Sequence, residues 1–510
     1  MPDQKSLILV TVDCLRADHC GFMGYPVPTT PFLDRLAAQS FVFPNALVAG
    51  VPTYYSFPAI LASRYPLALG REMLGLAPRE TNLASVLKNA GYQTAFFGAG
   101  NPYLSAQSGY DFGFDTFRDF SGGSIHDDSA NPLTESNWTT KLNFTLANLS
   151  HKIPAAGEAY DELYFQYCQH RAAPRSPSLD QLRRFPAANV IVDHAEAWFA
   201  SVGRDAPFFL WLHFMDPHAP YYPTEEALHL LEENKTTAAR ARYLNAYWNR
   251  SDLESRRLRR HSNEVIAMYD AGIRWVDAPL SRLVEGLRRL NLWDQCTVAL
   301  TADHGEEFLD HDGRYHAPSL TEELIHVPLL VRVPGVTKKN ICKNPFSLLH
   351  LGPTLLGSMN VPIPGDFQGR NLWPNLQQGT VWPVPAIAEC LTGSTNPFST
   401  SRLHGSRHLA IRETQYKLIL TFGQKNEILT ESFFDLESDP AERYPLPIQQ
   451  NRPERRRLLQ AALDHLQRSD SFRNSDAYLR MRIGRIARAW DEPGPSPNRS
   501  LTPEFQNLTG

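Results

Sequence analysis

The sequence predicts an α/β fold in which helices cover both faces of a mixed, mostly parallel sheet. Three apolar runs carry this prediction, because each has the length of a strand and ends on polar residues: 6–12, 208–214 and 297–302. A continuous apolar run without alternation is typical of a strand that is buried on both faces. Residues 327–335 contain a fourth strand of the same kind.

Helical patterns separate these strands. We expect one helix to open at Pro31 after the capping residue Thr30, and another to end at Gly91. Two further helices are expected over residues 186–202 and 263–290. Strands that alternate with helices indicate a parallel or mixed sheet with helices on its faces.

The sequence pattern changes after about residue 385, where short strand-like runs and turn residues replace the alternation of strands and helices. We therefore predict a catalytic domain over residues 1–385 and a small C-terminal α+β subdomain with an antiparallel sheet over 386–475. Residues 476–510 are expected to form a basic helix and a loose tail. This helix is either a solvated surface helix or a contact to a membrane or partner.

The composition excludes several classes of protein. The chain has 510 residues, of which 42% are hydrophobic, and its 50 basic and 54 acidic residues give a net charge of −4. A net charge this close to zero gives no long-range attraction to nucleic acid or to an anionic membrane, so any anion binding must depend on a local site. The apolar run at 6–12 is too short for a signal peptide, and no run is long enough for a membrane span. We expect a cytoplasmic protein whose six cysteines are reduced.

Polar residues follow two of the predicted strands directly. Asp13 comes after the first strand, and Asp303 and His304 come after the strand at 297–302. The carboxyl ends of strands in one parallel sheet meet at the same edge, which is where α/β proteins place their chemistry. Carboxylates and imidazoles are ligands for divalent cations. The sequence therefore predicts that these three residues hold a metal ion.

Several motifs resemble, in order, those of the sulfatase family of the alkaline phosphatase superfamily. They are TVDCLRADHCGFMGYPVPTTPFLDRLAAQSFVFPNAL, PTYYSFPAILASRYP, HFMDPHAPYYP, ALTADHGEEF, HVPLLVRVPG, YKLIL and FFDLESDPAE. The likeness runs over about residues 6–445. It implies an alkaline-phosphatase-like sheet and a metal-dependent ester hydrolase.

The resemblance also gives a nucleophile position. The sulfatase signature is Cys-x-Pro-Ser-Arg, and Arg64-Tyr65-Pro66 sets its register so that Thr53 stands on the cysteine and Ser56 on the serine. Tyr55 and Phe57 replace the proline and the arginine. Threonine cannot be converted to formylglycine, but its hydroxyl on a divalent metal can attack directly. The alternative role for Thr53 is that of a helix N-cap.

The same resemblance assigns Asp13, Asp303, His304 and Thr53 to one divalent metal ion. Cys14 stands where many members have a second aspartate, and it either ligates the ion or only packs beside it. Fewer carboxylates, an imidazole and a thiol suit zinc or manganese better than calcium, and the identity of the metal among these three stays open.

Two further histidines match positions that contact the bound anion or the leaving oxygen, namely His218 and His316. An imidazole at His316 can bind the ester oxygen, protonate the leaving group or ligate a second metal. Asp216 and His213 are candidates to complete such a two-metal site. His311 is expected to be a solvated loop residue.

These features predict a metal-dependent hydrolase of phosphoric or phosphonic esters with Thr53 as nucleophile and Ser56, His218 and His316 around the anion. The alternatives are a sulfuric ester hydrolase, a phosphotransferase and a non-catalytic anion- or glycan-binding relative. The substrate is expected to be a small-molecule or glycan anionic ester. Residues 119–185 and 219–262 carry no legible motif and are expected to be insertions around the site. The oligomeric state has no signature in the sequence.

Overall fold

The structure is a computed structural model of the whole chain. It describes residues 5–71, 73–77, 79–120, 149–150, 152, 154–172, 178–201, 206–231, 236–382, 384–393, 404–423, 427–447 and 452–468. The basic helix and tail predicted for residues 476–510 lie outside the described residues.

An eight-stranded sheet forms the centre of the molecule, in the order β11-β2-β10-β7-β1-β6-β4-β5. Its central pairs β7-β1, β1-β6, β6-β4 and β4-β5 are parallel, whereas β10 is antiparallel to β7 and β2. The predicted mixed, mostly parallel sheet is thus confirmed. Its strands are β1 (Ser6–Val12), β2 (Phe41–Val42), β4 (Gln93–Gly98), β5 (Thr116–Arg118), β6 (Phe208–Phe214), β7 (Cys296–Ala302), β10 (Leu329–Arg332) and β11 (Asn340–Ile341).

The three longest strands of this sheet are buried at every residue, as their uninterrupted apolar sequences require. The register aligns the last residue of β1, Val12, with Phe214 at the end of β6 and with Ala302 at the end of β7. The residues that follow these three strands therefore emerge side by side at one edge of the sheet. This edge carries the candidate site.

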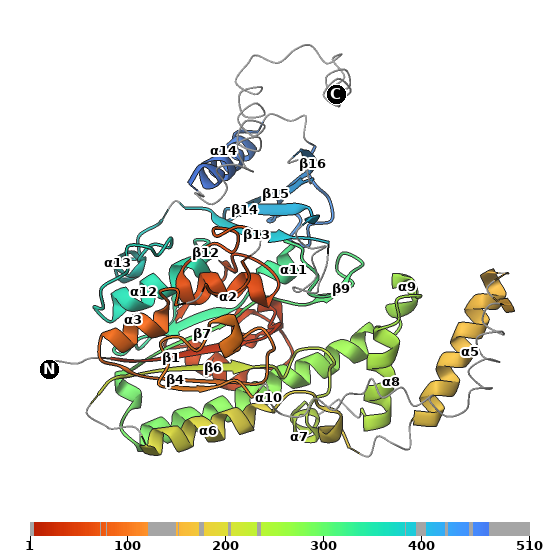
Figure 1. The fold of residues 1–510 in the computed structure, drawn as a ribbon, viewed down its shortest axis with the longest axis horizontal. Coiled ribbons are helices and arrows are strands. Elements are labelled where there is room, and N and C mark those ends of the chain that lie inside the picture. Colours follow the sequence, from red (N-terminus) through yellow and green to blue (C-terminus); the bar gives the residue numbers. More distant parts are fainter. Residues whose placement is uncertain are drawn as a thin grey trace, which may run out of the picture.

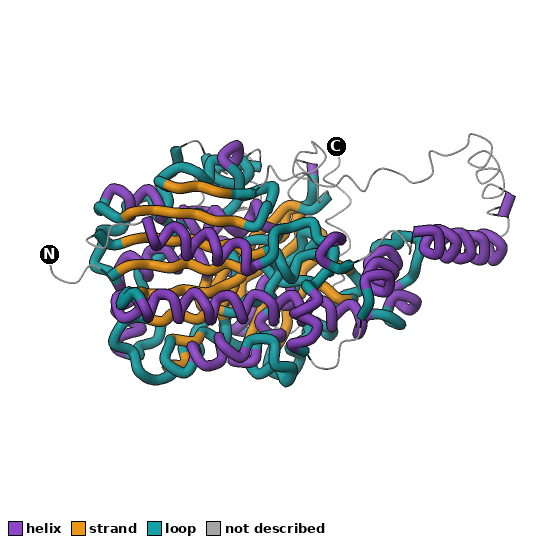
Figure 2. The backbone as a smooth tube through the Cα atoms, turned by 90° about the horizontal axis from the view of Figure 1, so that it is seen from below, coloured by secondary structure: helices purple, strands orange, loops and turns teal. Residues whose placement is uncertain are grey.

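Helices cover both faces of the sheet (Figure 1), and Figure 2 shows the long ones lying along the strands. One face carries α2 (Thr53–Ala62), α3 (Leu83–Asn89) and α12 (Leu351–Ser358), and the other carries α6 (Ala188–Ser201) and α10 (Ser262–Arg289). The remaining elements are α1 (Pro31–Ala37), α5 (Pro154–Ala172), α7 (Glu225–Leu230), α8 (Ala238–Trp248), α9 (Ser255–Leu258), α11 (Glu322–Ile325), α13 (Trp373–Gln378), β3 (Ala46–Leu47), β8 (Glu307–Phe308), β9 (Arg314–Tyr315) and β12 (Phe346–Ser347).

Local sequence signals set the ends of α3. The Asn82 side chain accepts a hydrogen bond from the backbone of Ser85, whose own side chain reaches back to Asn82 in a capping box. After the helix, Gly91 has a φ of 89°, a left-handed conformation that glycine adopts without a Cβ penalty. The predicted stop of this helix at Gly91 is therefore confirmed.

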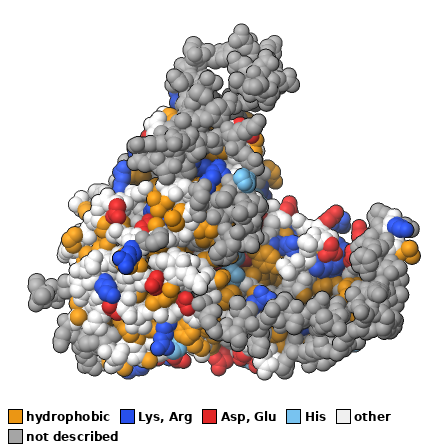
Figure 3. All heavy atoms as spheres, in the orientation of Figure 1, with side chains coloured by type: hydrophobic (Ala, Val, Ile, Leu, Met, Phe, Trp, Pro, Cys, Tyr) orange, Lys and Arg blue, Asp and Glu red, His pale blue; other side chains and the backbone are white. Residues whose placement is uncertain are grey.

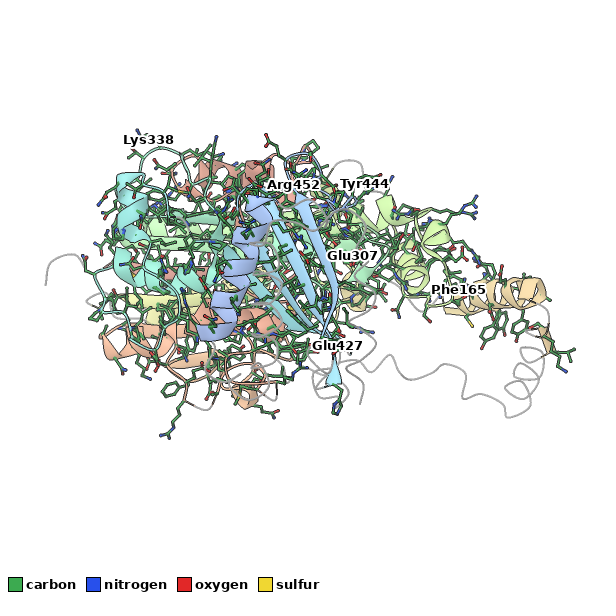
Figure 4. The ribbon with its side chains drawn as sticks, turned by 90° about the horizontal axis from the view of Figure 1, so that it is seen from above. Phe165, Glu307, Lys338, Glu427, Tyr444 and Arg452 are labelled. Carbon is green, nitrogen blue, oxygen red and sulfur yellow. The ribbon has the colours of Figure 1, made fainter. Side chains whose placement is uncertain are left out.

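The segments predicted as insertions contain helices, and α5, α8 and α9 extend to one side of the sheet (Figure 1). The Phe165 ring of α5, which is labelled in Figure 4, packs against Tyr243 and Tyr247 of α8. The Arg250 guanidinium lies 4.8 Å from the centre of the same ring. Aromatic and cation–π contacts thus join α5 to α8.

A second, four-stranded antiparallel sheet follows, with the order β13-β14-β15-β16. Its strands are β13 (Ala386–Leu391), β14 (Arg407–Arg412), β15 (Tyr416–Phe422) and β16 (Ile428–Asp435), and α14 (Pro453–Arg468) lies across them (Figure 4). Leu418 and Phe433 of the sheet form a separate apolar cluster with Leu459 and Leu466 of the helix. The predicted small antiparallel subdomain is confirmed, while its limits at 385 and 475 stay predictions. Among the described residues, no helix combines the length and apolar character needed to cross a membrane.

Glu389 of β13 joins the C-terminal sheet to the catalytic domain. Its carboxylate accepts hydrogen bonds from Arg407 at 2.6 Å, His465 at 3.2 Å and the backbone N–H of Leu67 at 2.9 Å. Its own backbone N–H donates to the Ala49 carbonyl. Burial raises the pKa of Glu389, but Arg407 and His465 outweigh burial and lower it to about 2. Four segments of the chain therefore depend on one ionised side chain.

We expect Glu389→Gln to lower the free energy of unfolding by about 3–5 kcal/mol, because it leaves the buried Arg407 guanidinium without this carboxylate. Since the pKa of Glu389 falls from its usual 4.5 to about 2 on folding, its stabilisation is complete above pH 4.5 and is lost toward pH 2. Thermal unfolding followed by circular dichroism should show the variant's deficit shrinking over that interval. The control Glu413→Gln, which removes a largely exposed pair with Arg457, should cost about 0–1 kcal/mol. An equal, pH-independent loss in both variants would contradict this role.

Candidate active site

The edge of the sheet brings the three predicted metal ligands together. Asp13 follows β1, and Asp303 and His304 follow β7; each offers a ligand atom within 4.8 Å of the other two. The His304 Nε2 atom lies 3.4 Å from Asp303 Oδ2 and 3.9 Å from Asp13 Oδ1. All three side chains are fully buried. The polar residues that directly follow β1 and β7 therefore lie close enough to share one ion.

The chemistry of this set fits a divalent cation. His304 Nδ1 lies 2.9 Å from the Gly305 carbonyl, which can only accept, so Nδ1 carries the proton and Nε2 a lone pair. Among the described residues, Asp303 Oδ2 is buried without a hydrogen-bond partner. A lone pair and an unsatisfied carboxylate oxygen facing one point are what a bound cation would satisfy.

The two carboxylates are electrostatically unequal. Burial and the neighbouring charge of Asp13 raise the pKa of Asp303 to about 8. Burial also raises the pKa of Asp13, but His218, His213 and His304 outweigh it and hold that pKa well below its usual value. A divalent cation between the carboxylates would favour the ionised form of both.

Thr53 is the first residue of α2, and its hydroxyl donates to His304 Nε2 at 3.1 Å. The N-cap is Pro52, so the alternative interpretation of Thr53 as an N-cap is wrong. The helix starts several residues earlier than its apolar core suggests. The N-terminal end of α2 therefore presents a hydroxyl to the cluster, and the positive end of the helix dipole there favours an anion. Ser56 is also buried, and its hydroxyl donates to the Thr53 carbonyl at 3.1 Å.

Cys14 occupies the turn that follows Asp13, with a left-handed φ of 58°. The Tyr269 hydroxyl holds this turn by donating to the Cys14 carbonyl at 2.6 Å and accepting from the Arg16 N–H at 2.9 Å. The Cys14 thiol donates to Asp13 Oδ1 at 3.0 Å and lies 3.4 Å from His316 Nδ1. Burial and Glu306 raise the pKa of Cys14 well above its usual value. The thiol is thus within reach of the ion site and is neutral without a metal.

His218 and His316 face each other beside the metal cluster, with ring centres 5.0 Å apart, and the His316 ring is 4.6 Å from that of His304. Burial lowers the pKa of His218. Burial also lowers the pKa of His316, but Glu306 outweighs it and raises the pKa to about 9. One neutral and one protonated imidazole therefore adjoin the position that an ester would occupy.

Two site residues were missed from the sequence. Glu306 is fully buried; its carboxylate accepts from His316 Nδ1 at 3.0 Å and from the Tyr221 hydroxyl at 2.7 Å. Asn101 follows β4 and donates to Asp13 Oδ2 at 2.7 Å. Asn101 could have been predicted, because it is a polar residue shortly after a strand, as Asp13 is. Glu306 lies within the motif ALTADHGEEF but has no distinguishing signal of its own.

Asp216 and His213 do not join a second metal set. Asp216 instead accepts a hydrogen bond from Arg183 at 2.7 Å, and His213 pairs with Thr11 behind Asp13. Neither belongs to a group of three potential ligands among the described residues. The groups that do form contain Cys14 with His304 and His316, and Cys14 with Asp13 and His218.

His311 lies in an exposed turn, as expected, and its side chain also takes part in an ion pair. Its Nδ1 atom lies 2.9 Å from the buried Glu323 carboxylate, and its backbone N–H donates to Glu307. Glu323 raises the pKa of His311 to about 9 against the effect of burial. Figure 4 labels Glu307, which belongs to this separate ion-pair group.

The fold and the convergent carboxylate, imidazole and hydroxyl groups are those of ester hydrolases with an alkaline-phosphatase-like sheet. The family model "Sulfatase" matches residues 5–361, and the model "N-sulphoglucosamine sulphohydrolase, C-terminal" matches residues 310–469. The chain belongs to the sulfatase family.

Individual relatives agree with this assignment. An ulvan-active sulfatase of Formosa agariphila is 24% identical over 501 residues, which cover 94% of this chain and 84% of that protein. A solved structure described under the metabolism of multiple glycosaminoglycans by Bacteroides thetaiotaomicron has a TM-score of 0.68 at 19% identity, over 95% of this chain and 99% of the other. The phosphonate monoester hydrolase of Agrobacterium radiobacter has a TM-score of 0.61 at 17% identity, over 90% and 96%. The comparisons as a whole favour sulfuric ester hydrolysis, the alternative prediction from the sequence, over phosphoric ester hydrolysis.

We expect Asp13→Asn and Asp303→Asn to weaken metal binding at least ~100-fold, because loss of a direct ligand costs no less than loss of its supporting partners. Thr53→Ala should keep the ion, since Asp13, Asp303 and His304 remain. Metal content after dialysis, measured by plasma mass spectrometry, distinguishes the variants. Asp294→Asn is the matched control, because this exposed carboxylate lies just before β7 at the opposite end of the strand. Full metal content in both cluster variants would refute the ligand set.

Proposed function

We propose that the protein is a metal-dependent hydrolase of phosphoric or phosphonic esters that attacks with the Thr53 hydroxyl. The observation that carries this proposal is the position of Thr53: it is the first residue of a helix, with its Oγ1 atom 3.1 Å from His304 Nε2 inside the set of metal ligands. A bound divalent cation would stabilise the alkoxide and the charge on the ester oxygens.

Thr53, His316 and His218 have separate roles in the proposed reaction. Thr53 loses its hydroxyl proton to solvent and its Oγ1 forms a bond to phosphorus while the bond to the leaving oxygen breaks, which gives phosphothreonine. His316, protonated beside Glu306, donates to the leaving oxygen, and His218 contacts the anion. Water then attacks phosphorus and frees the Thr53 hydroxyl. Asn101 and His213 hold Asp13 in place during both steps.

The second candidate function is sulfuric ester hydrolysis, and the family match favours it. The family model covers residues 5–361, and an ulvan-active sulfatase aligns over 94% of the chain. Threonine opposes this candidate chemically, because it cannot supply the aldehyde hydrate that sulfatases use. A sulfated threonine would have to be released by attack of water on sulfur. The phosphonate hydrolase neighbour supports only the point that this fold also accommodates phosphorus chemistry.

The substrate that fits either candidate is an anionic ester of a small molecule or a glycan. Basic and acidic side chains are interspersed over the described part of the face in Figure 3, in keeping with a net charge of −4. Such a surface does not attract a polyanion from a distance, so recognition must depend on the site itself.

We expect Thr53→Ala to abolish turnover, Thr53→Ser to retain much of it, and Ser56→Ala to remain able to form the covalent adduct. The reason is that the Thr53 hydroxyl faces the ligand set whereas the Ser56 hydroxyl donates to the Thr53 carbonyl, and a primary hydroxyl at position 53 serves the same role. Intact mass spectrometry after a short pulse with an aryl phosphate should show a phosphorylated wild-type chain and no adduct on Thr53→Ala.

Matched aryl phosphate, phosphate diester, phosphonate and sulfate esters, each assayed with zinc, manganese and calcium, separate the two candidates. A higher kcat/KM on phosphorus esters supports the proposal. Turnover restricted to sulfate esters would replace it by the sulfatase candidate, and near wild-type activity of Thr53→Ala would refute the nucleophile in both.

We expect His316→Ala to lower turnover ~10²-fold or more on esters with poor leaving groups, and less on activated aryl esters, because the latter need no proton. Glu306→Gln should give a smaller loss with the same leaving-group dependence, since Glu306 acts through His316. His311→Ala is the control, because this histidine belongs to the separate Glu307–Glu323 group. Rates plotted against leaving-group pKa check the pattern. Equal losses on all esters would contradict the acid role of His316.

A further inference from the structure

We propose that a cavity between α14 and the catalytic domain binds a small organic anion that carries a sulfate or phosphate group. The cavity has a volume of about 440 Å³. This volume lies in the range of small-molecule sites, roughly 300–1,000 Å³, and far exceeds the space that a single inorganic ion fills. The inference does not depend on the proposed function.

Two arginines from distant parts of the sequence line this cavity. Arg370 lies in the loop between α12 and α13, and Arg468 is the last residue of α14. Within the described part of the chain, neither guanidinium has a carboxylate oxygen within 4.0 Å. Both charges act on the Tyr65 phenol, where they oppose the rise in its pKa that burial and Glu389 cause. The two guanidinium groups, both on exposed residues, thus contribute positive charge near this phenol.

Neutral donors surround the same space. The Arg370 backbone N–H donates to His350 Nδ1 at 3.0 Å, so the proton of this imidazole is on Nε2. Burial and Arg370 lower the pKa of His350 to about 4, so the ring stays neutral near pH 7. The Gln368 carbonyl oxygen accepts from the Tyr65 N–H at 2.8 Å, which leaves the amide NH₂ to donate elsewhere. The cavity therefore offers guanidinium, imidazole, amide and phenol donors.

The remaining walls set the size and charge of the ligand. Leu349, Val384 and Ile387 supply apolar surface that suits the organic part of a ligand. Asp464 also lines the cavity, and its carboxylate accepts from Gln460 at 2.9 Å. One carboxylate against two arginines leaves a net positive charge of one. This balance favours a single sulfate or phosphate group over a polyanion.

The cavity is distinct from the active site. Thr53 is the first residue of α2, whereas Tyr65 lies three residues beyond its end at Ala62. The His465 ring packs edge-on against Tyr65 with ring centres 4.5 Å apart and also binds the Glu389 carboxylate. A ligand in the cavity therefore contacts the Glu389 junction and not the metal ligands.

Isothermal titration calorimetry on the full chain tests this proposal. The Thr53→Ala variant prevents turnover and serves as the background, and the probes are inorganic sulfate, inorganic phosphate, glucose 6-sulfate and glucose 6-phosphate. We expect one binding event that is lost or weakened at least ~10-fold when Arg370→Ala and Arg468→Ala are added, because each removes charge-assisted hydrogen bonds. The sugar esters should bind more tightly than the inorganic ions, because they also fill the apolar walls.

Charge-matched variants make the result specific. Arg35→Ala with Arg289→Ala removes two exposed arginines outside the cavity and should leave this event unchanged. Asp464→Asn should tighten binding a few-fold, since it removes the one carboxylate, and this gain would appear without any loss of packing. Unchanged affinity and stoichiometry in the Arg370/Arg468 variant, or loss of all binding in an Asp303→Asn background, would overturn the proposal. The Arg370/Arg468 variant with Thr53 restored should hydrolyse soluble aryl esters at the wild-type rate.

Discussion

The pairing of β1 with both β6 and β7 is the constraint on which the rest of the structure depends. Because the three strands are parallel and end in register, the residues after them have to share a small buried volume. Asp13 and Asp303 meet there as two fully buried carboxylates, which is unfavourable without a compensating positive charge. Helix α2, the histidines and the bound cation expected at the site all supply parts of that compensation.

A second level of organisation supports the groups around the carboxylates. Tyr269 fixes the turn at Cys14, Asn101 fixes Asp13, and Glu306 fixes His316. These partners come from α10, from the loop after β4 and from the loop after β7. Side chains held by hydrogen bonds at their far ends lose little freedom when an ester binds, which is a general requirement for precise positioning.

The sequence was sufficient for the sheet and for the clustering of Asp13, Asp303 and His304 because both follow from local patterns. Apolar runs show the strands, and polar residues directly after them show Asp13, Asp303 and His304. Other roles depend on tertiary partners that no local pattern contains. Arg183, which lies in an expected insertion, pairs with Asp216 and removes it from the metal cluster, and Glu323 pairs with His311 in an exposed turn.

The thiol at Cys14 has a consequence for electroneutrality. One divalent cation would balance the Asp13 and Asp303 carboxylates, and burial keeps the thiol uncharged by raising its pKa. A second aspartate at this position would leave the loaded site with a surplus negative charge. With cysteine there, the loaded cluster would carry no net charge, and an incoming ester dianion would meet the cation and His316 without a surplus negative charge. The difference of one charge at the turn after β1 thus shifts the site toward substrates that bring two negative charges rather than one.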